Sequence, residues 1–337
     1  MKKNILLGHG SGGKLSHDLI SNLFVRYFDN PTLNSQTDSA LLKIEGENIA
    51  FTTDSYVVDP VFFPGGDIGK LAVAGTVNDI AVSGAKPLFL SASFIIEEGL
   101  PLADLKTIVK SMAEEAKKAG VLIVTGDTKV VNKGKCDKIF INTSGIGILN
   151  KNHKNISSGK NIKTDDKIII NGTIGDHGMA ILSARNELNI KSNIVSDCAC
   201  LNYLIEKALS VSSEIKFMRD ATRGGVATIL SELSENKNFG IQIEESSVKV
   251  KEEVRGMCEI LGFDPLYVAN EGKVLIVVGS KDAERVLKVL KQDELGKDST
   301  IIGEIVDEHP GKSWITTGIG GKRIIDMLTG EQLPRIC

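Results

Sequence analysis

Gly75-Thr76-Val77-Asn78-Asp79 combines small residues, helical spacing and a carboxylate in one short segment. It lies within residues 67–83, where apolar and small residues recur at three- and four-residue intervals and predict a single closely packed helix. A carboxylate on a packed helix is costly to desolvate unless a cation lies nearby. Asp79 is therefore a candidate metal ligand, and Asn78 beside it a candidate nucleotide contact.

The segments on both sides of this helix predict two domains that mix helices and strands. In the first half, strands are expected at 40–44, 49–53, 121–125 and 139–148, and a helix at 102–119. Residues 150–164 are polar and mark a domain boundary. Beyond it, strands are expected at 167–170, 241–244, 273–278 and 301–305, and helices at 176–187, 197–211, 223–236, 250–261 and 282–293. Without regular strand–helix alternation, we expect an α+β fold with mixed or antiparallel sheets flanked by helices.

Composition narrows the class of protein. The 337 residues carry 40 basic and 43 acidic side chains, a net charge of -3 that favours neither nucleic acid nor an anionic membrane as partner. No apolar run approaches the ~20 residues of a membrane span. The five cysteines lack CxxC spacing, which indicates a reducing compartment, and we expect a soluble cytoplasmic protein. Cys198 and Cys200 could form a three-thiolate site with Cys337, or could be small residues that open a helix.

A glycine-rich loop at residues 8–14 is a candidate phosphate site. The amides of Gly12 and Gly13 can surround phosphate oxygens, and Lys14 adds a positive charge. Leu15 stands where a P-loop would place a magnesium-binding Ser or Thr, so we expect a nucleotide lid over residues 1–35 instead. An ordinary glycine-rich linker is the alternative.

Four aspartates stand at predicted strand ends or on the packed helix. They are Asp38, Asp54, Asp79 and Asp127. Hard carboxylate oxygens suit Mg²⁺, which keeps some coordination sites for nucleotide phosphates. We assign Asp54, Asp79 and Asp127 to the metal and Asp38 to the nucleotide, with solvated turn acids as the alternative.

Further polar residues extend the candidate site into the second half. Lys129 follows Asp127 by two residues, so both point to the same side of an extended segment. Asp220 and Thr222 precede a helix, where either residue caps the helix or contributes to a second wall of a phosphate cleft. Glu271 comes just before a strand as a candidate acid or base, or as a plain turn residue.

The chain ends on Pro334-Arg335-Ile336-Cys337, which places a thiol on the last residue. Chain termini are usually mobile unless tied down, and each residue adds at most ~3.5 Å of reach. We expect residues 326–337 to form a mobile tail that carries Cys337 into an active site. A frayed end that finishes on cysteine is the alternative.

Together these segments resemble the HypE family of hydrogenase maturation factors, which are carbamoyl-cysteine dehydratases of the PurM-like, AIR synthetase-related ATP-binding superfamily. The superfamily resemblance rests on residues 8–14, 54, 75–79, 126–128 and 220–225, and the family resemblance on residues 334–337. It covers nearly the whole chain. It implies a PurM-like ATP-binding domain over residues 36–150 and a second PurM-like domain over residues 165–310.

The resemblance also implies an activity. A carbamoyltransferase, HypF, loads Cys337; ATP with Mg²⁺ activates the amide oxygen; and loss of water leaves a thiocyanate. The cyano group then passes to iron on the HypC–HypD complex for the [NiFe]-hydrogenase site. Glu271 is expected to remove protons and Lys129 to orient the carboxamide or phosphate. A homodimer is expected, and the tail's entry into its own or its partner's site stays open.

Three other functions remain compatible with the residues alone. A small-molecule ATP enzyme of the same fold would work without the tail. A non-catalytic scaffold would use nucleotide only to dock and release the tail. A redox module would use Cys198, Cys200 and Cys337.

Overall fold

The computed structural model describes residues 14–19, 21–22, 33–37, 40–44, 47–185, 192–328, 333 and 335–337. Gly12, Gly13 and Asp38 lie outside these described residues, as does His9, so the first three keep the roles predicted for them. Lys14 begins the short helix α1 (Lys14–Leu19), where its side chain is exposed and its amide donates to the Leu328 carbonyl.

The first domain is built on a five-stranded mixed sheet of order β1-β2-β7-β5-β6. Its strands are β1 (Ala40–Ile44), β2 (Glu47–Tyr56), β5 (Ala85–Glu97), β6 (Leu122–Val131) and β7 (Ile139–Leu149). Neighbours are antiparallel except β5 and β6. A small hairpin pairs β3 (Phe62–Phe63) with β4 (Gly66–Asp67).

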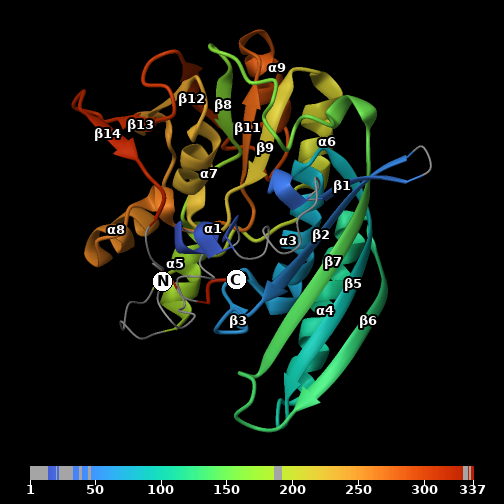
Figure 1. Ribbon diagram of the computed structural model, residues 1–337. Helices are drawn as coiled ribbons and strands as arrows, with labels where there is room; N and C mark the ends of the chain where they lie inside the picture. Colours follow the sequence, from blue (N-terminus) through green and yellow to red (C-terminus); the bar gives the residue numbers. More distant parts are fainter. Residues whose placement is uncertain are drawn as a thin grey trace.

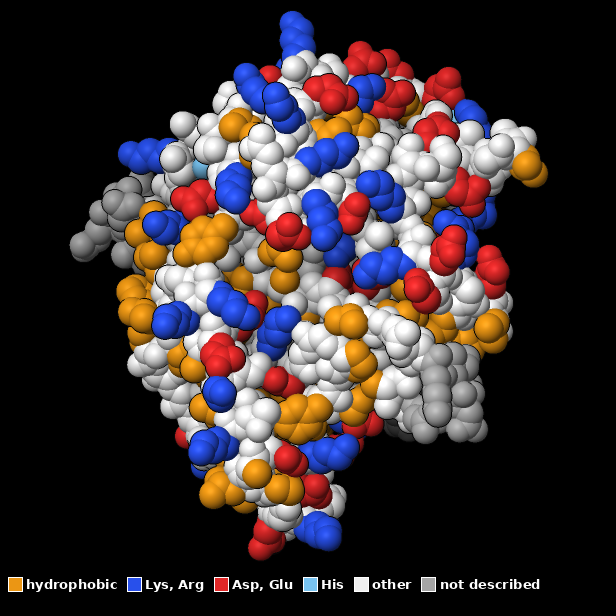
Figure 2. Space-filling view, turned by 180° about the vertical axis from the view of Figure 1, so that it is seen from behind, with side chains coloured by type: hydrophobic (Ala, Val, Ile, Leu, Met, Phe, Trp, Pro, Cys, Tyr) orange, Lys and Arg blue, Asp and Glu red, His pale blue; other side chains and the backbone are white. Residues whose placement is uncertain are grey.

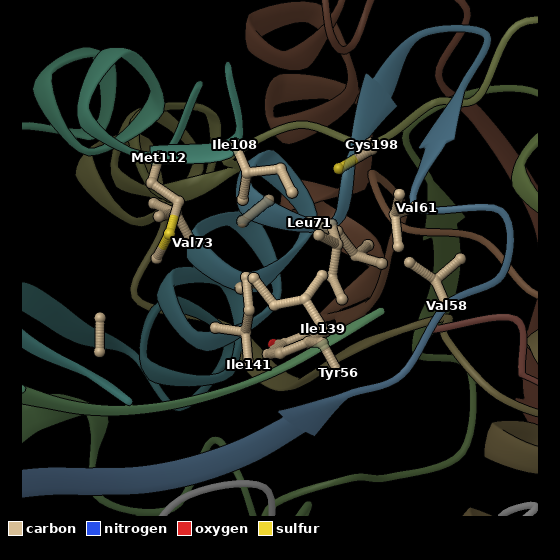
Figure 3. Close-up of a cluster of buried hydrophobic side chains, with 14 of the residues drawn as sticks. Tyr56, Val58, Val61, Leu71, Val73, Ile108, Met112, Ile139, Ile141 and Cys198 are labelled. Atoms are coloured by element: carbon tan, nitrogen blue, oxygen red, sulfur yellow. The ribbon is translucent and has the colours of Figure 1, made fainter. Parts of the chain in front are cut away.

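Helices α3 (Ile68–Val82) and α4 (Leu102–Ala119) cover one face of this sheet (Figure 1). Asp67 caps α3 by accepting hydrogen bonds from the Gly69 and Lys70 amides. Gly147 of β7 lies directly beneath α3, and a Cβ there would come within 2.4 Å of the Ile80 side chain. The core between helix and sheet, shown in Figure 3, includes Leu71, Ile108, Met112, Ile139 and Ile141. Glycines in β7 thus set how deeply α3 sits.

The second domain has a seven-stranded mixed sheet of order β14-β13-β10-β12-β8-β11-β9. Its strands are β8 (Lys167–Ile170), β9 (Ile215–Asp220), β10 (Gly240–Glu244), β11 (Val274–Val278), β12 (Thr300–Val306), β13 (Ser313–Thr316) and β14 (Lys322–Ile325). Its helices are α5 (Asp176–Ala184), α6 (Asn202–Val211), α7 (Gly225–Ser234), α8 (Glu252–Leu261) and α9 (Ser280–Leu290). Every residue of β11 is buried, because apolar clusters pack on both faces of this sheet.

The predicted α+β class with mixed sheets is confirmed, and most expected elements are present. The helix expected at 197–211 begins only at Asn202, because the backbone before it bonds elsewhere: Ala199 donates to the Glu271 carbonyl and Leu201 to the Asn78 side chain. The long strand β5 was not predicted. In the described part of the chain no helix is both long and apolar enough to cross a membrane.

Candidate active site

Acidic side chains gather where β2 and α3 meet the second domain. Asp54 and Tyr56 stand on the α3-facing side of β2, and the Tyr56 hydroxyl lies 3.3 Å from Asp54 Oδ2. The Thr52 hydroxyl donates to Asp79 Oδ2 on α3 at 2.7 Å. Burial raises the pKa of Tyr56 well above its ordinary value, and the carboxylates of Asp54, Asp79 and Glu271 raise it further. Carboxylates from both domains therefore converge on Tyr56.

Glu271 is the buried member of this group, with 3 % of its surface exposed. Burial raises its pKa well above the ordinary range, and the nearby charges of Asp220, Asp197 and Asp54 add to that rise while Arg223 opposes it. Its Oε1 atom has no hydrogen-bond partner. A carboxylate with a raised pKa and an unoccupied oxygen is suited to accept a proton.

A buried ion pair holds the Glu271 backbone in place. Asp197 Oδ2 lies 2.8 Å from Lys273 Nζ, and the Asp197 carboxylate also accepts the amides of Glu271 and Gly272. Burial alone would raise the pKa of Asp197, but Lys273 outweighs it and the pKa is lowered. Asp197 therefore stays charged and fixes the turn that presents Glu271.

The β9–α7 connection supplies the opposite side of the site. Asp220 ends β9 with 7 % of its surface exposed, and Thr222 is half-buried two residues later. Arg223 follows them. Cys337 makes the largest contribution to raising the pKa of Arg223, and Asp54 and Glu271 contribute as well. The guanidinium thus lies among the acids of both domains and the chain terminus.

The C-terminus is docked in this group of residues, where Figure 1 marks it beside β3. The Cys337 carbonyl accepts a hydrogen bond from the Val57 amide at 3.0 Å, and the Arg335 carbonyl accepts one from the Asp59 amide at 3.2 Å. Ile336 is 4 % exposed and belongs to the first domain's core. The tail was expected to be unanchored. In this structure residues 335–337 are instead tied down within their own subunit.

Asp127 and Lys129 are not brought to these acids. The strand predicted to end at residue 125 continues to Val131 through its parallel pairing with β5, so Asp127 lies mid-strand opposite Ser93. Three strand spacings, about 14 Å, separate β6 from β2. Both side chains also share the sheet face opposite α3. Within one chain, the described residues contain no group of three or more His, Cys, Asp or Glu able to hold a metal ion.

Asn78, predicted to contact nucleotide, joins the two domains. It is 1 % exposed, its Nδ2 donates to the Ala199 carbonyl at 3.0 Å, and its Oδ1 accepts the Leu201 amide at 2.7 Å. Asn78 therefore holds backbone of the second domain through both of its amide atoms, and its nucleotide contact stays a prediction.

The Cys198 and Cys200 thiols do not resemble a redox or metal site. Burial raises the pKa of both thiols well above the ordinary value, with Glu271 adding to the rise at Cys198 and Glu115 at Cys200. Because the thiolate is the reactive form, both are kept unreactive. Figure 3 shows Cys198 within the apolar core.

Several residues of the site were missed by sequence reasoning. Tyr56 sits two residues beyond Asp54 on an alternating strand, which was a usable signal. Arg223 stood inside a segment already singled out. Asp197, Lys273 and the tail contacts had no local signal, because their partners lie far away in sequence.

Two family models cover the chain. The model for AIR synthase related protein, N-terminal domain, matches residues 36–149, and the model for AIR synthase related protein, C-terminal domain, matches residues 163–315. The two α+β domains of this chain, which meet at the acidic group, therefore place it among the AIR synthase related proteins.

Close relatives narrow this class. Carbamoyl dehydratase HypE of Escherichia coli strain K12 is 49% identical over 341 residues, covering 99% of this chain and 99% of that protein. A solved structure of HypE in complex with ATP is 48% identical with a TM-score of 0.82, covering 99% of this chain and 100% of that one. A HypE–HypF complex gives 55% identity and a TM-score of 0.86, covering 92% of this chain and 99% of its match. This chain belongs to the HypE carbamoyl dehydratases, which are hydrogenase maturation enzymes.

Proposed function

We propose that this enzyme dehydrates a carbamoyl group carried on its own Cys337, turning an S-carboxamide into a thiocyanate. The docked tail is the observation that carries this proposal, because it hydrogen-bonds Cys337 to Val57, the residue after Tyr56 of the acidic group, and Cys337 also raises the pKa of Arg223. Both domains contribute to that group. Docking of the tail adds Cys337 to it and completes the site.

The residues fit a magnesium–nucleotide complex. Asp54 and Asp79 of the first domain would each offer a carboxylate to Mg²⁺, whose other coordination sites would be left for phosphates, and Asp220 lies across the junction as a further acid of the site. Burial raises the pKa values of Tyr56 and Glu271; Asp54 and Asp79 add to the rise at Tyr56, and Asp220 and Asp54 add to it at Glu271, which a divalent cation would relieve. When bound, magnesium ATP supplies the phosphoryl group that makes the amide oxygen a leaving group. The predicted glycine-rich lid would lie over the same phosphates.

Protein groups move the protons and balance the charge. Glu271 would accept a proton from the carboxamide nitrogen, since its raised pKa makes it a stronger base than an ordinary glutamate. Arg223 would offset negative charge on the departing oxygen. The Val57 amide donates to the main-chain carbonyl oxygen of Cys337, which holds the residue that carries the sulfur in the docked position.

We further propose the partners. A solved HypE–HypF complex, 55% identical to this chain on the HypE side, supports HypF as the enzyme that loads Cys337. The HypC–HypD complex would receive the cyano group. All five cysteines are among the described residues and none forms a disulfide, which supports work in a reducing cytoplasm.

A homodimer would explain the open face of the first sheet. Apolar side chains are exposed there, including Phe51, Phe89, Ile95, Ile146 and Ile148, and β6 adds Leu122. Figure 2 shows apolar side chains along its left edge, the side on which β6 lies. A second copy would cover this surface. Because Asp127 and Lys129 lie on the same face, we propose that they serve the partner's site.

Intact-mass measurement tests the reaction. The protein is incubated with HypF and carbamoyl donor, separated from HypF, and given magnesium ATP. The carbamoyl adduct should lose one water only when ATP is added, and Cys337→Ser should acquire no adduct. An adduct that never loses water would support a scaffold instead, and turnover of a free substrate by a tail-deleted chain would support a small-molecule enzyme.

A further inference from the structure

The last residues are held by contacts that lie outside the chemistry. Arg335 Nε donates to the Val57 carbonyl at 3.0 Å, and its guanidinium pairs with Asp137. Arg335 has a backbone φ of 51°, a left-handed conformation that L residues rarely adopt. The docked tail therefore depends on specific contacts to hold this shape.

His177, at the start of α5, makes the most buried of these contacts. It is 0 % exposed, and its Nε2 lies 2.7 Å from the Ile336 carbonyl oxygen. Its ring also packs edge-on against Phe63, with ring centroids 5.5 Å apart. The catalytic steps proposed above give this residue no function.

The hydrogen-bond network sets the tautomer of His177. Burial lowers its pKa, so the ring is neutral at physiological pH. The Ser196 hydroxyl oxygen accepts the Cys198 amide at 3.1 Å, which leaves its own hydrogen for His177 Nδ1 at 2.8 Å. Nε2 then carries the proton and donates to Ile336. The ring is thus prearranged to donate to the tail.

Arg185 adds another contact from the end of the same helix. Its Nε donates to the Asp59 carbonyl and its Nη2 to the Arg335 carbonyl, each at 2.8 Å. One side chain thereby joins the tail to the segment of the first domain that the tail follows. Together, His177, Arg185 and Asp137 form what we call the tail clamp.

We propose that the tail clamp positions Cys337 in the nucleotide site of its own subunit, with His177 as a positioning residue. This inference rests on the proposed carrier function of Cys337. The contacts of the clamp are made to backbone carbonyls and to Arg335. Because Ile336 is buried in the docked tail, the tail would have to leave for another enzyme to reach Cys337, so weakening the clamp should have opposite effects on loading and on dehydration.

The experiment replaces His177 in the full-length protein. His177→Phe keeps the ring but removes the donor, and leaves the Ile336 carbonyl buried without a partner. His177→Gln places an amide N–H near the original position and is the matched rescue. Iodoacetamide labelling of each cysteine is followed by peptide mass spectrometry, with Cys136, half-buried like Cys337, as the reference and buried Cys258 as the reporter of unfolding.

We expect His177→Phe to raise labelling of Cys337 and lower ATP-dependent dehydration of loaded protein, each by roughly tenfold for a lost buried hydrogen bond. Loading by HypF should be unimpaired, and His177→Gln should stay near wild type. Unchanged labelling and dehydration in His177→Phe would overturn the proposal. So would a fall in dehydration without any gain in Cys337 labelling while Cys258 stays protected.

A surface variant covers the case in which His177→Phe exposes Cys258. Asp137→Asn removes the charge that pairs with Arg335 at a partly exposed position. It should slow dehydration by a few-fold without slowing loading, and equal rates for variant and wild type would refute the clamp. Failure of wild-type loaded protein to lose water would instead overturn the proposed function, since Cys337 labelling still reports on the docked tail.

Discussion

Glu271 shows how a single side chain's surroundings select its chemistry. It lies in a turn before β11, where a glutamate would usually be exposed to solvent. Burial and the charges of Asp220, Asp197 and Asp54 destabilise its ionised form, with Arg223 as partial compensation. Such an arrangement lowers stability, and it agrees with the proposed role of Glu271 as a base, because strongly shifted carboxyl pKa values cluster at functional sites.

Replacing Glu271 should therefore separate activity from stability. Glu271→Gln keeps the size and removes the base, so dehydration of loaded protein should fall by about 10²-fold or more. The same change removes an unfavourable buried charge, and the melting temperature near pH 8 should rise by about 2 °C. Single-turnover mass spectrometry and calorimetry measure the two effects. A variant that loses stability and activity together would contradict this assignment.

The pH dependence has a definite sign. Because the folded-state pKa of Glu271 is raised, the folded protein binds its proton more tightly than the unfolded chain does, and stability is lost as pH rises through the raised pKa. Dehydration needs the deprotonated base, so its rate should increase over the same interval, well above the ordinary glutamate value of about 4.3. Glu271→Gln should remove the stability slope. A rate that falls with rising pH would identify Glu271 as an acid instead.

The Asp197–Lys273 pair should matter far more than a surface pair. Asp197→Asn leaves Lys273 buried and uncompensated, which should cost about 3–5 kcal/mol of unfolding free energy. Glu294→Gln disrupts the exposed pair with Lys297 and should change stability by less than about 0.5 kcal/mol. Urea unfolding measures the change in unfolding free energy of both variants. Equal changes would show that the buried pair stabilises the protein no more than the exposed pair does.

At the scale of elements, the seating of α3 on β7 positions half of the site. Asp79 belongs to α3, and Asp54 belongs to β2, which pairs with β7. Close approach of α3 depends on Gly147, where no side chain intervenes. A shift of the helix would move one acid relative to the other.

Adding a methyl group beneath α3 should consequently be harmful. Gly147→Ala places a Cβ within 2.4 Å of Ile80 and should cost about 1–3 kcal/mol. Gly256→Ala lies on α8 with no atom within 4 Å, and should add up to about 1 kcal/mol of stability. The urea midpoint should move in opposite directions in the two variants. Movement in the same direction would mean that β7 relaxes to accommodate the methyl group.

At the scale of the whole molecule, the open face of the first sheet bears on whether one chain can form a complete active site. Asp54 faces α3, whereas Asp127 and Lys129 lie on the other face and several strands away. No local rearrangement brings a side chain through a hydrogen-bonded sheet. If these residues serve the site, a second copy must deliver them.

Mixed dimers test this directly. Asp54→Asn and Asp127→Asn should each lose activity alone, but mixing them places one intact pair in each mixed dimer. The purified mixed dimer should then show about half of wild-type activity, because one of its two sites is intact. Mixing a chain that carries both substitutions with an inactive Cys337→Ser chain would not be informative. The two single variants are instead co-expressed with different tags, and the mixed dimer is purified through both tags. No recovery in the doubly tagged dimer would place Asp127 outside its partner's site.

Local pattern was sufficient for most elements, the α+β class, and the candidacy of Asp54, Asp79, Asp220 and Glu271. Helical spacing, alternation and turn chemistry act over a few residues, so they are readable along the chain. The terminal cysteine and the glycine-rich segments likewise carried the family resemblance in short motifs.

Tertiary structure alone decided which candidates meet. Strand order put Asp127 on the far face, domain packing committed Asn78 to backbone, and residues more than 100 positions apart, such as His177 and Ile336, came into contact. These outcomes depend on strand register and on the burial of charge by distant segments. Neither is encoded in any short stretch, because each arises only when the two domains pack together.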